Sequence, residues 1–98
     1  MNIGKHELSI EFKNEYYQNY ITEDDIYNAN CYFDHGQFII NMNETKQLIL
    51  HCKFISISYK LLSSDKYVII IDTDLCIVNI TLGISSFECF RKILSMKV

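Results

Sequence analysis

The stretch that decides the fold is QLILHCKFISISYKLL, residues 47–62. Its apolar residues recur at every second position, which is the period of a half-buried β-strand. They do so in two phases, which contain first Leu48, Leu50, Cys52 and Phe54, and then Ile55, Ile57, Tyr59 and Leu61. A one-residue change of phase inside a strand is typical of a β-bulge or a sharp bend. The stretch therefore predicts one long strand that bends near Phe54 and Ile55.

Two further strands are predicted downstream, YVIIID at 67–72 and LCIVNITL at 75–82. Both are nearly continuously apolar and rich in β-branched residues, which favours central strands that are covered on both faces. The C-terminal segment is the candidate cover, because Ser85 and Glu88 have the spacing of a capping box. Apolar residues follow at helical intervals, namely Phe87, Phe90, Ile93 and Leu94. We expect a C-terminal helix packed on one face of the sheet.

The N-terminal half predicts a strand, a short helix and a hairpin. HELSIEF, residues 6–12, alternates apolar and polar residues as a strand does. Thr22 precedes three acidic residues, which favours an N-cap and a short helix, with Ile21 and Ile26 as a hydrophobic staple. NCYFDHGQFIINM, residues 30–42, is typical of a hairpin whose three-residue loop, 34–36, ends at a left-handed Gly36.

Together these elements predict an α+β fold. The 98 residues, of which 49% are hydrophobic and 21% charged, suit a single domain spanning 1–98. We expect an antiparallel five- or six-stranded sheet, mostly a meander, with the C-terminal helix on one face and a short helix after the first strand. The segment from Lys13 to Tyr20 is compatible with strand, helix or loop.

Acidic residues and tyrosines gather in the N-terminal third. Residues 1–36 contain seven of the twelve acidic residues, two lysines and five of the seven tyrosines. Tyrosine is favoured at protein interfaces, and carboxylates around it attract a basic partner. The predicted partner-binding residues are Glu15, Tyr16, Tyr17, Tyr20, Glu23, Asp24, Asp25, Tyr27 and Asp34. The alternative is that the acids cap a helix and solvate a surface, while the tyrosines pack over the sheet edge.

Several function classes are disfavoured. The net charge of −3 and the scattered lysines provide no basic stripe for nucleic acid. Cys31, His35, His51 and Cys52 are ligand types without the spacing of a zinc site, and Asp72 and Asp74 are ordinary turn residues. Cys52 and His51 are neighbours on a strand and point apart, so they are not a nucleophile and base. We expect no enzyme activity, no cofactor and no metal.

The expected location is the cytoplasm. No apolar run approaches the length that crosses a bilayer, and the first twelve residues lack the apolar segment of a signal peptide. Four widely spaced cysteines, three of them among apolar residues, suit buried thiols in a reducing compartment.

The function expected from these features is binding. The leading hypothesis is a non-enzymatic immunity protein or antitoxin that neutralises a basic toxin, for example a nuclease. One alternative is a phage or viral antagonist of a host nucleic-acid-binding defence protein. The other is a homo-oligomeric structural module joined through a sheet edge or through the apolar strands 67–71 and 75–80.

Overall fold

Six strands form one antiparallel sheet in the order β1-β6-β5-β4-β3-β2. The computed structural model of the chain describes residues 7–97, and for residues 90 and 93–97 it describes the backbone alone. The strands are β1 (Glu7–Phe12), β2 (Asn30–Asp34), β3 (Gln37–Asn41), β4 (Ile49–Ser63), β5 (Lys66–Thr73) and β6 (Cys76–Gly83). The helices are α1 (Glu15–Tyr20), α2 (Glu23–Tyr27) and α3 (Ile84–Lys97). The α+β class and the largely meandering antiparallel sheet are as predicted, with six strands.

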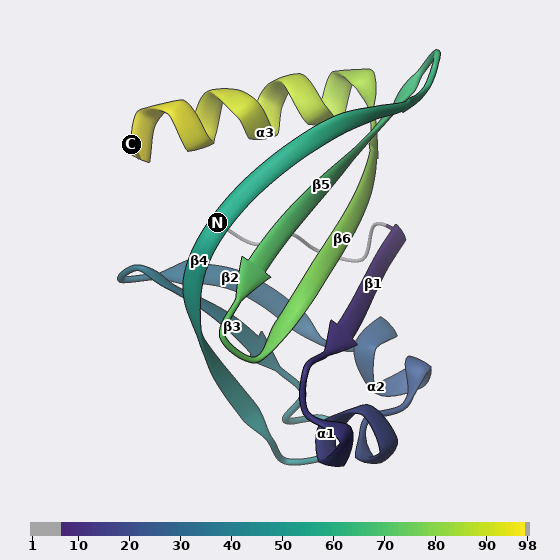
Figure 1. Cartoon of the computed structure of the whole chain (residues 1–98), viewed down its shortest axis with the longest axis vertical. Helices are drawn as coiled ribbons and strands as arrows, with labels where there is room; N and C mark the ends of the chain where they lie inside the picture. The colour runs from purple at the N-terminus through teal and green to yellow at the C-terminus, as the bar shows by residue number, and fades with distance from the viewer. Residues whose placement is uncertain (1–6, 98) are drawn as a thin grey trace.

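The long strand β4 holds the sheet together, because it pairs with β3 along its first part and with β5 along its second part. The pairing with β5 shifts between Phe54 and Ser56, which leaves Ile55 as an extra residue without a partner in β5. This is the predicted bulge. Ile55 itself is 54% exposed. The prediction that Ile55 belongs to the same apolar phase as Ile57 is therefore wrong. Figure 1 shows β4 curving along the length of the molecule.

The core lies on the inner face of this curved sheet. Side chains from all six strands meet there, including Ile10, Phe38, Ile40, Ile71 and Val78. The phase change in β4 contributes to it, because Phe54 and Ile57 both pack against the core although three positions separate them. A strictly alternating strand would place them on opposite faces.

The outer face of β5 and β6 departs from the prediction. Their inward residues are buried, but most of the outward ones between them are half-buried, among them Ile70, Ile77 and Asn79. The prediction that both strands are covered on both faces is therefore wrong. Their near-continuous apolar sequence reflects β-branched residues that suit a partly exposed sheet surface as well as a buried one.

The β2–β3 hairpin has a shorter turn than predicted. Asp34 pairs with Gln37, so the loop is the two residues His35 and Gly36. Both have positive φ, 48° and 79°, as two-residue loops of this class require. Gly36 is left-handed as predicted, but the three-residue loop is wrong because His35 also adopts the left-handed conformation.

The first turn of α3 contacts the sheet through Phe87. Its side chain is 3% exposed, and its ring stacks on Tyr67 of β5 with centroids 4.1 Å apart. The helix begins at Ile84, so Ser85 lies inside it rather than at its cap. The side chains of Phe90, Ile93 and Leu94 lie outside the described residues, so packing of the remaining helix on the sheet stays a prediction.

Two short helices follow β1 where one was predicted. Asn14 caps α1 by accepting from the backbone N–H of Tyr16, and Thr22 caps α2. Both helices contact β1, and Figure 1 shows them together at the end of that strand. Within residues 7–97, no helix is both long enough and apolar enough to cross a membrane.

Candidate functional site

The acidic turn of α2 begins with a reciprocal cap. The N–H of Thr22 donates to Oδ2 of Asp25 at 2.9 Å, and the N–H of Asp25 donates to Oγ1 of Thr22 at 3.1 Å. Asp25 is 6% exposed, and Nζ of Lys46 lies 3.6 Å from its carboxylate. Its carboxylate therefore stabilises the helix start and is largely hidden from solvent.

The cap also lowers the pKa of Asp25 below its usual value of 3.8. The main cause is the hydrogen bond from the backbone of Thr22, which favours the ionised form. The hydroxyls of Thr45 and Thr22 and the charge of Lys46 act in the same direction, while partial desolvation opposes them. The charged form of Asp25 is thus the one built into the fold.

The predicted tyrosines of α1 form an aromatic cluster. Tyr16 stacks on Tyr20 at 5.5 Å and meets the edge of Tyr17 at 5.4 Å, and Tyr17 lies 5.9 Å from Phe12. Nζ of Lys46 lies 4.6 Å from the centre of the Tyr20 ring, within the range of a cation–π contact. Lys46 of this chain therefore covers part of the tyrosine surface that was predicted to meet a basic partner.

The predicted binding residues do not form one face. Glu15 begins α1, whereas Glu23 and Asp24 are exposed on α2 and Tyr27 ends it. Asp34 lies at the β2–β3 turn, where its carboxylate contacts Nδ1 of His35 at 2.6 Å. Figure 1 shows this turn on the opposite side of the molecule from α2.

An open groove of about 1230 Å³ runs between β1 and the two short helices. All six residues of β1 line one side of it. Its other side contains residues from α1, α2 and the turn between them, namely Gln18, Ile21, Thr22, Glu23, Asp24, Ile26 and Tyr27. The predicted residues Glu23, Asp24 and Tyr27 thus meet at this groove, and the other predicted residues lie outside it.

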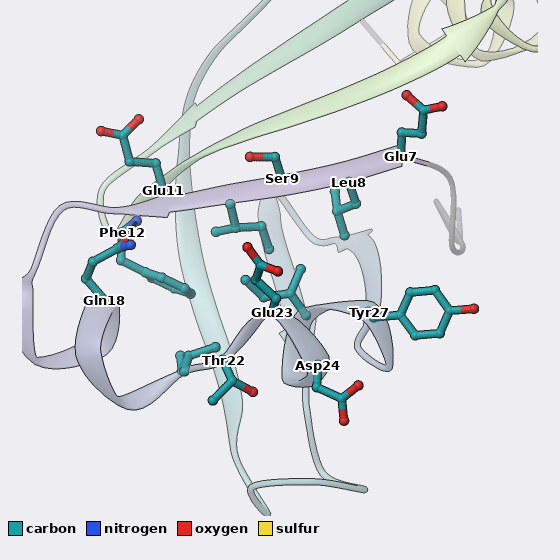
Figure 2. A pocket seen from close by; sticks show the side chains of 13 residues that line it. Glu7, Leu8, Ser9, Glu11, Phe12, Gln18, Thr22, Glu23, Asp24 and Tyr27 are labelled. Atoms are coloured by element: carbon teal, nitrogen blue, oxygen red, sulfur yellow. Dashed lines mark hydrogen bonds between the residues drawn. The ribbon is translucent and has the colours of Figure 1, made fainter.

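The groove is acidic. Four of the thirteen residues that line it are Glu7, Glu11, Glu23 and Asp24, and none of the thirteen is Lys, Arg or His. Figure 2 shows the carboxylate of Glu23 directed from α2 toward β1, with Glu7 and Glu11 on the far side of the strand and Asp24 on the outer side of α2. The basic residue Lys66 does not line the groove but lies beside it, with its Nζ 3.8 Å from the carboxylate of Glu7. Of the four carboxylates, that of Glu23 is directed into the groove, so the α2 side of the groove favours a positively charged ligand.

Glu7, Glu11 and Gln18 line the site but were not among the predicted binding residues. Glu7 and Glu11 alternate with half-buried or buried neighbours on β1, and that alternation indicates an exposed position. Their proximity to α2 could not be read from the chain, since α2 follows β1 by ten residues. Gln18 accepts a hydrogen bond from the N–H of Phe12 at 3.0 Å, which no local pattern predicts.

The residues considered for metal binding have other partners or lie apart. Nζ of Lys13 contacts Asp72 at 2.8 Å, and the N–H of Lys53 donates to Asp74 at 2.8 Å. Cys31 and Cys52 are fully buried, whereas His35 and His51 are exposed. Within residues 7–97, no three His, Cys, Asp or Glu side chains gather closely enough to hold a metal ion.

Two of the three buried thiols, Cys31 and Cys52, are disfavoured as thiolates, whereas the hydrogen bond with Cys52 lowers the pKa of Cys76. Burial raises the pKa of Cys31 to about 12. The pKa of Cys52 is also raised, by its hydrogen bond to Cys76 and by burial. A thiol with a raised pKa is a poor nucleophile at neutral pH.

Comparison with known proteins returns no relative: no protein-family model, curated protein or solved structure matches this chain.

Proposed function

We propose that the protein is a non-enzymatic binding protein that neutralises a basic protein partner, as an immunity protein or antitoxin does to a toxin. The observation that carries the proposal is the composition of the β1–α2 groove, with four acidic residues and no basic residue among the thirteen that line it. Carboxylates at a binding surface speed the encounter with a basic partner and disfavour acidic competitors. A nuclease toxin, whose cleft must attract phosphate, has the complementary charge.

The lining of the groove also determines which residues we propose to contact the partner. Glu7, Glu11, Glu23 and Asp24 supply the charge, and Tyr27, which is 66% exposed, supplies apolar area at the rim. Asp25 is assigned to the helix cap and Asp34 to the distant β-turn. A cytoplasmic location is part of the proposal.

The test compares two charge-reversed proteins. The groove variant carries Glu23→Lys and Asp24→Lys, and the matched control carries Glu44→Lys and Asp65→Lys, which are exposed acidic positions outside the groove. Each tagged protein is incubated with host lysate at low and at high salt, and the retained protein is identified by mass spectrometry. The purified partner's activity is then measured with and without each variant.

The expected result is one basic partner that is inhibited by the parent and the control protein. The groove variant should associate with it at least about tenfold more slowly at low salt, because steering is electrostatic. Equal inhibition by both variants would contradict the proposal. So would a partner whose activity the parent protein leaves unchanged.

A second candidate is a homo-oligomeric module. It is favoured by apolar side chains exposed near the β4–β5 turn and the start of α3, where Tyr59, Leu61, Leu62 and Ile84 are each more than 40% exposed. Light scattering over a concentration series tests it, since a monomer at high concentration contradicts it. The interfaces expected from the sequence, a sheet edge or the apolar strands β5 and β6, stay part of this candidate; β5 and β6 are interior in the sheet order, so they would meet a second copy through a face.

A further inference from the structure

The strand β1 is at an edge of the sheet, with β6 on one side and the acidic groove on the other. The groove touches every residue from Glu7 to Phe12. Consecutive residues of a strand point to opposite faces, so a hollow that touches all six lies along the edge of the strand and not over one face. The backbone of β1 is therefore part of the groove wall.

The hydrogen bonds at the end of β1 establish which backbone groups face the groove. The N–H of Lys13 donates to the carbonyl of Leu75 at 2.9 Å, across the continuation of the β1–β6 pairing. The N–H of the preceding residue, Phe12, points the other way and donates to Gln18 at 3.0 Å. Because an antiparallel ladder alternates, Glu7, Ser9 and Glu11 bond to β6, whereas Leu8 and Ile10 direct their N–H and C=O groups into the groove.

Gln18 supplies at Phe12 the acceptor that a neighbouring strand would supply. Within residues 7–97, no corresponding protein partner is found for the N–H or C=O of Leu8 and Ile10. These two residues offer two donors and two acceptors in the spacing of a strand edge, which is the feature that β-strand addition uses.

The charges along the edge determine which strand can add. Glu7 and Glu11 lie on either side of Ser9 with their side chains on the outer face. If two copies paired antiparallel about Ser9, Glu7 of each copy would face Glu11 of the other, and like charges opposite one another destabilise a pair. A strand with basic residues on its outer face would instead place them beside Glu7 and Glu11. Glu23, from α2, adds a further carboxylate on the groove side.

We propose that the groove binds an extended basic segment of a partner protein, which adds to β1 as a seventh, antiparallel strand. Its backbone bonds to Leu8 and Ile10, its basic side chains lie beside Glu7 and Glu11, and its alternate apolar side chains lie on the side of Leu8. This inference rests on the proposed function and specifies how the basic partner is held.

The test uses short synthetic peptides in which lysine and valine alternate, blocked at both ends. In the proposed antiparallel register, the valines share the face of Leu8 and Ile10, so the valine amides point at β1 and the lysine amides point away. One peptide is N-methylated on the valine amides and a matched one on the lysine amides. They have the same charge, and differ only in which edge has lost its donors. A peptide of alternating glutamate and valine is the charge control.

The expected result is that methylation of the valine amides weakens binding at least about tenfold, since it removes two or more hydrogen bonds, whereas methylation of the lysine amides leaves it within about threefold. In the complex, hydrogen exchange at the amides of Leu8 and Ile10 should slow, while the amide of Ser9, already bonded to β6, should not change. Loss of binding on lysine methylation instead would support strand addition in the parallel direction.

Two other outcomes overturn the inference in different ways. If both methylated peptides bind equally and high salt abolishes both, the groove attracts basic ligands without adding a strand, and the proposed function still stands. If no lysine peptide binds better than the glutamate peptide, the groove does not recognise basic segments, and the proposed function fails with it. The variant Leu8→Pro, compared with Leu8→Ala, gives a check from the protein side, because the N–H that proline removes faces the groove and not β6, and Leu8→Pro should bind the lysine peptide more weakly than Leu8→Ala does.

Discussion

Thr22 and Asp25 bond to each other's backbone N–H across the first turn of α2, at 2.9 and 3.1 Å. An aspartate that the composition offers to a binding face is thereby placed inside the molecule, at 6% exposure. Its neighbours Glu23 and Asp24 remain exposed in the same turn. The acidic run therefore combines one structural carboxylate with two that can meet a partner.

The cap itself can be tested by Thr22→Ala. We expect the free energy of unfolding to fall by about 1 kcal/mol, within the range known for loss of an N-cap hydroxyl. Thr22→Ser is the matched control, because serine retains the hydroxyl. It should lower the free energy of unfolding by only about a few tenths of a kcal/mol. Urea unfolding followed by circular dichroism measures both, and equal losses in the two variants would contradict the cap.

The lowered pKa of Asp25 predicts an acid-dependent loss of stability. Above pH 3.8 the carboxylate is charged in both the folded and the unfolded chain, and its stabilising bonds are intact. As the pH falls below 3.8 the unfolded chain takes up the proton first, so this contribution is lost progressively. In Asp25→Asn we expect lower stability at pH 7 and a smaller further loss between about pH 4 and pH 2.

Asp24→Asn is the control for that titration, since Asp24 is exposed in the same turn. Unfolding free energies of the parent and both variants are compared across the acid range. If Asp25→Asn loses as much stability on acidification as the parent does, Asp25 is not the group responsible.

The cysteines should differ sharply in reactivity. Cys31, Cys52 and Cys76 are fully buried, whereas Cys89 is exposed on α3. With iodoacetamide at neutral pH we expect one label on the folded protein, at Cys89, and four after denaturation. Peptide mass spectrometry locates the label. Rapid labelling of a second cysteine in the folded state would show that the core opens more readily than its packing indicates.

Two isoleucines near the bulge in β4 differ in burial and should therefore differ in their contribution to stability. Ile71 of β5 is fully buried beside Ile57, whereas Ile55 is 54% exposed. We expect Ile71→Ala to lower the unfolding free energy by about 2–5 kcal/mol, through lost burial and a cavity. Ile55→Ala should lower it by less than about 1 kcal/mol. Similar losses in thermal or urea unfolding would mean that Ile55 is not the extra residue.

The local patterns predicted most of the secondary structure because each has a short-range physical cause. The phase change at Phe54 and Ile55 located the bulge, and Thr22 located the start of α2. The predictions failed where the cause lies outside the segment. His35 takes a positive φ to suit the twist of its hairpin. The half-burial of Ile70 and Ile77 was missed because nothing in their own segments indicates what covers the second face of the sheet.

The candidate site could be predicted only in part. Tyrosines and acids were grouped by their nearness in sequence, and the fold separates Asp34 from α2 while it brings Glu7 and Glu11 to the groove. That proximity results from the pairing of β1 with β6, which a single sequence does not reveal. That the backbone groups of Leu8 and Ile10 meet no partner within residues 7–97 is likewise a property of strand order.

The pairing of Glu7 with Thr81 has a consequence for the order of folding. The hairpins from β2 to β6 join neighbours in the chain and can form one after another, whereas β1 must find a partner at the opposite end of the sequence, a contact that is slow to form. During synthesis on the ribosome, β1 emerges first and waits until β6 has emerged. Until then both of its edges are available, so a partner or chaperone that binds extended acidic or apolar strands has its best access to β1 before β6 has emerged.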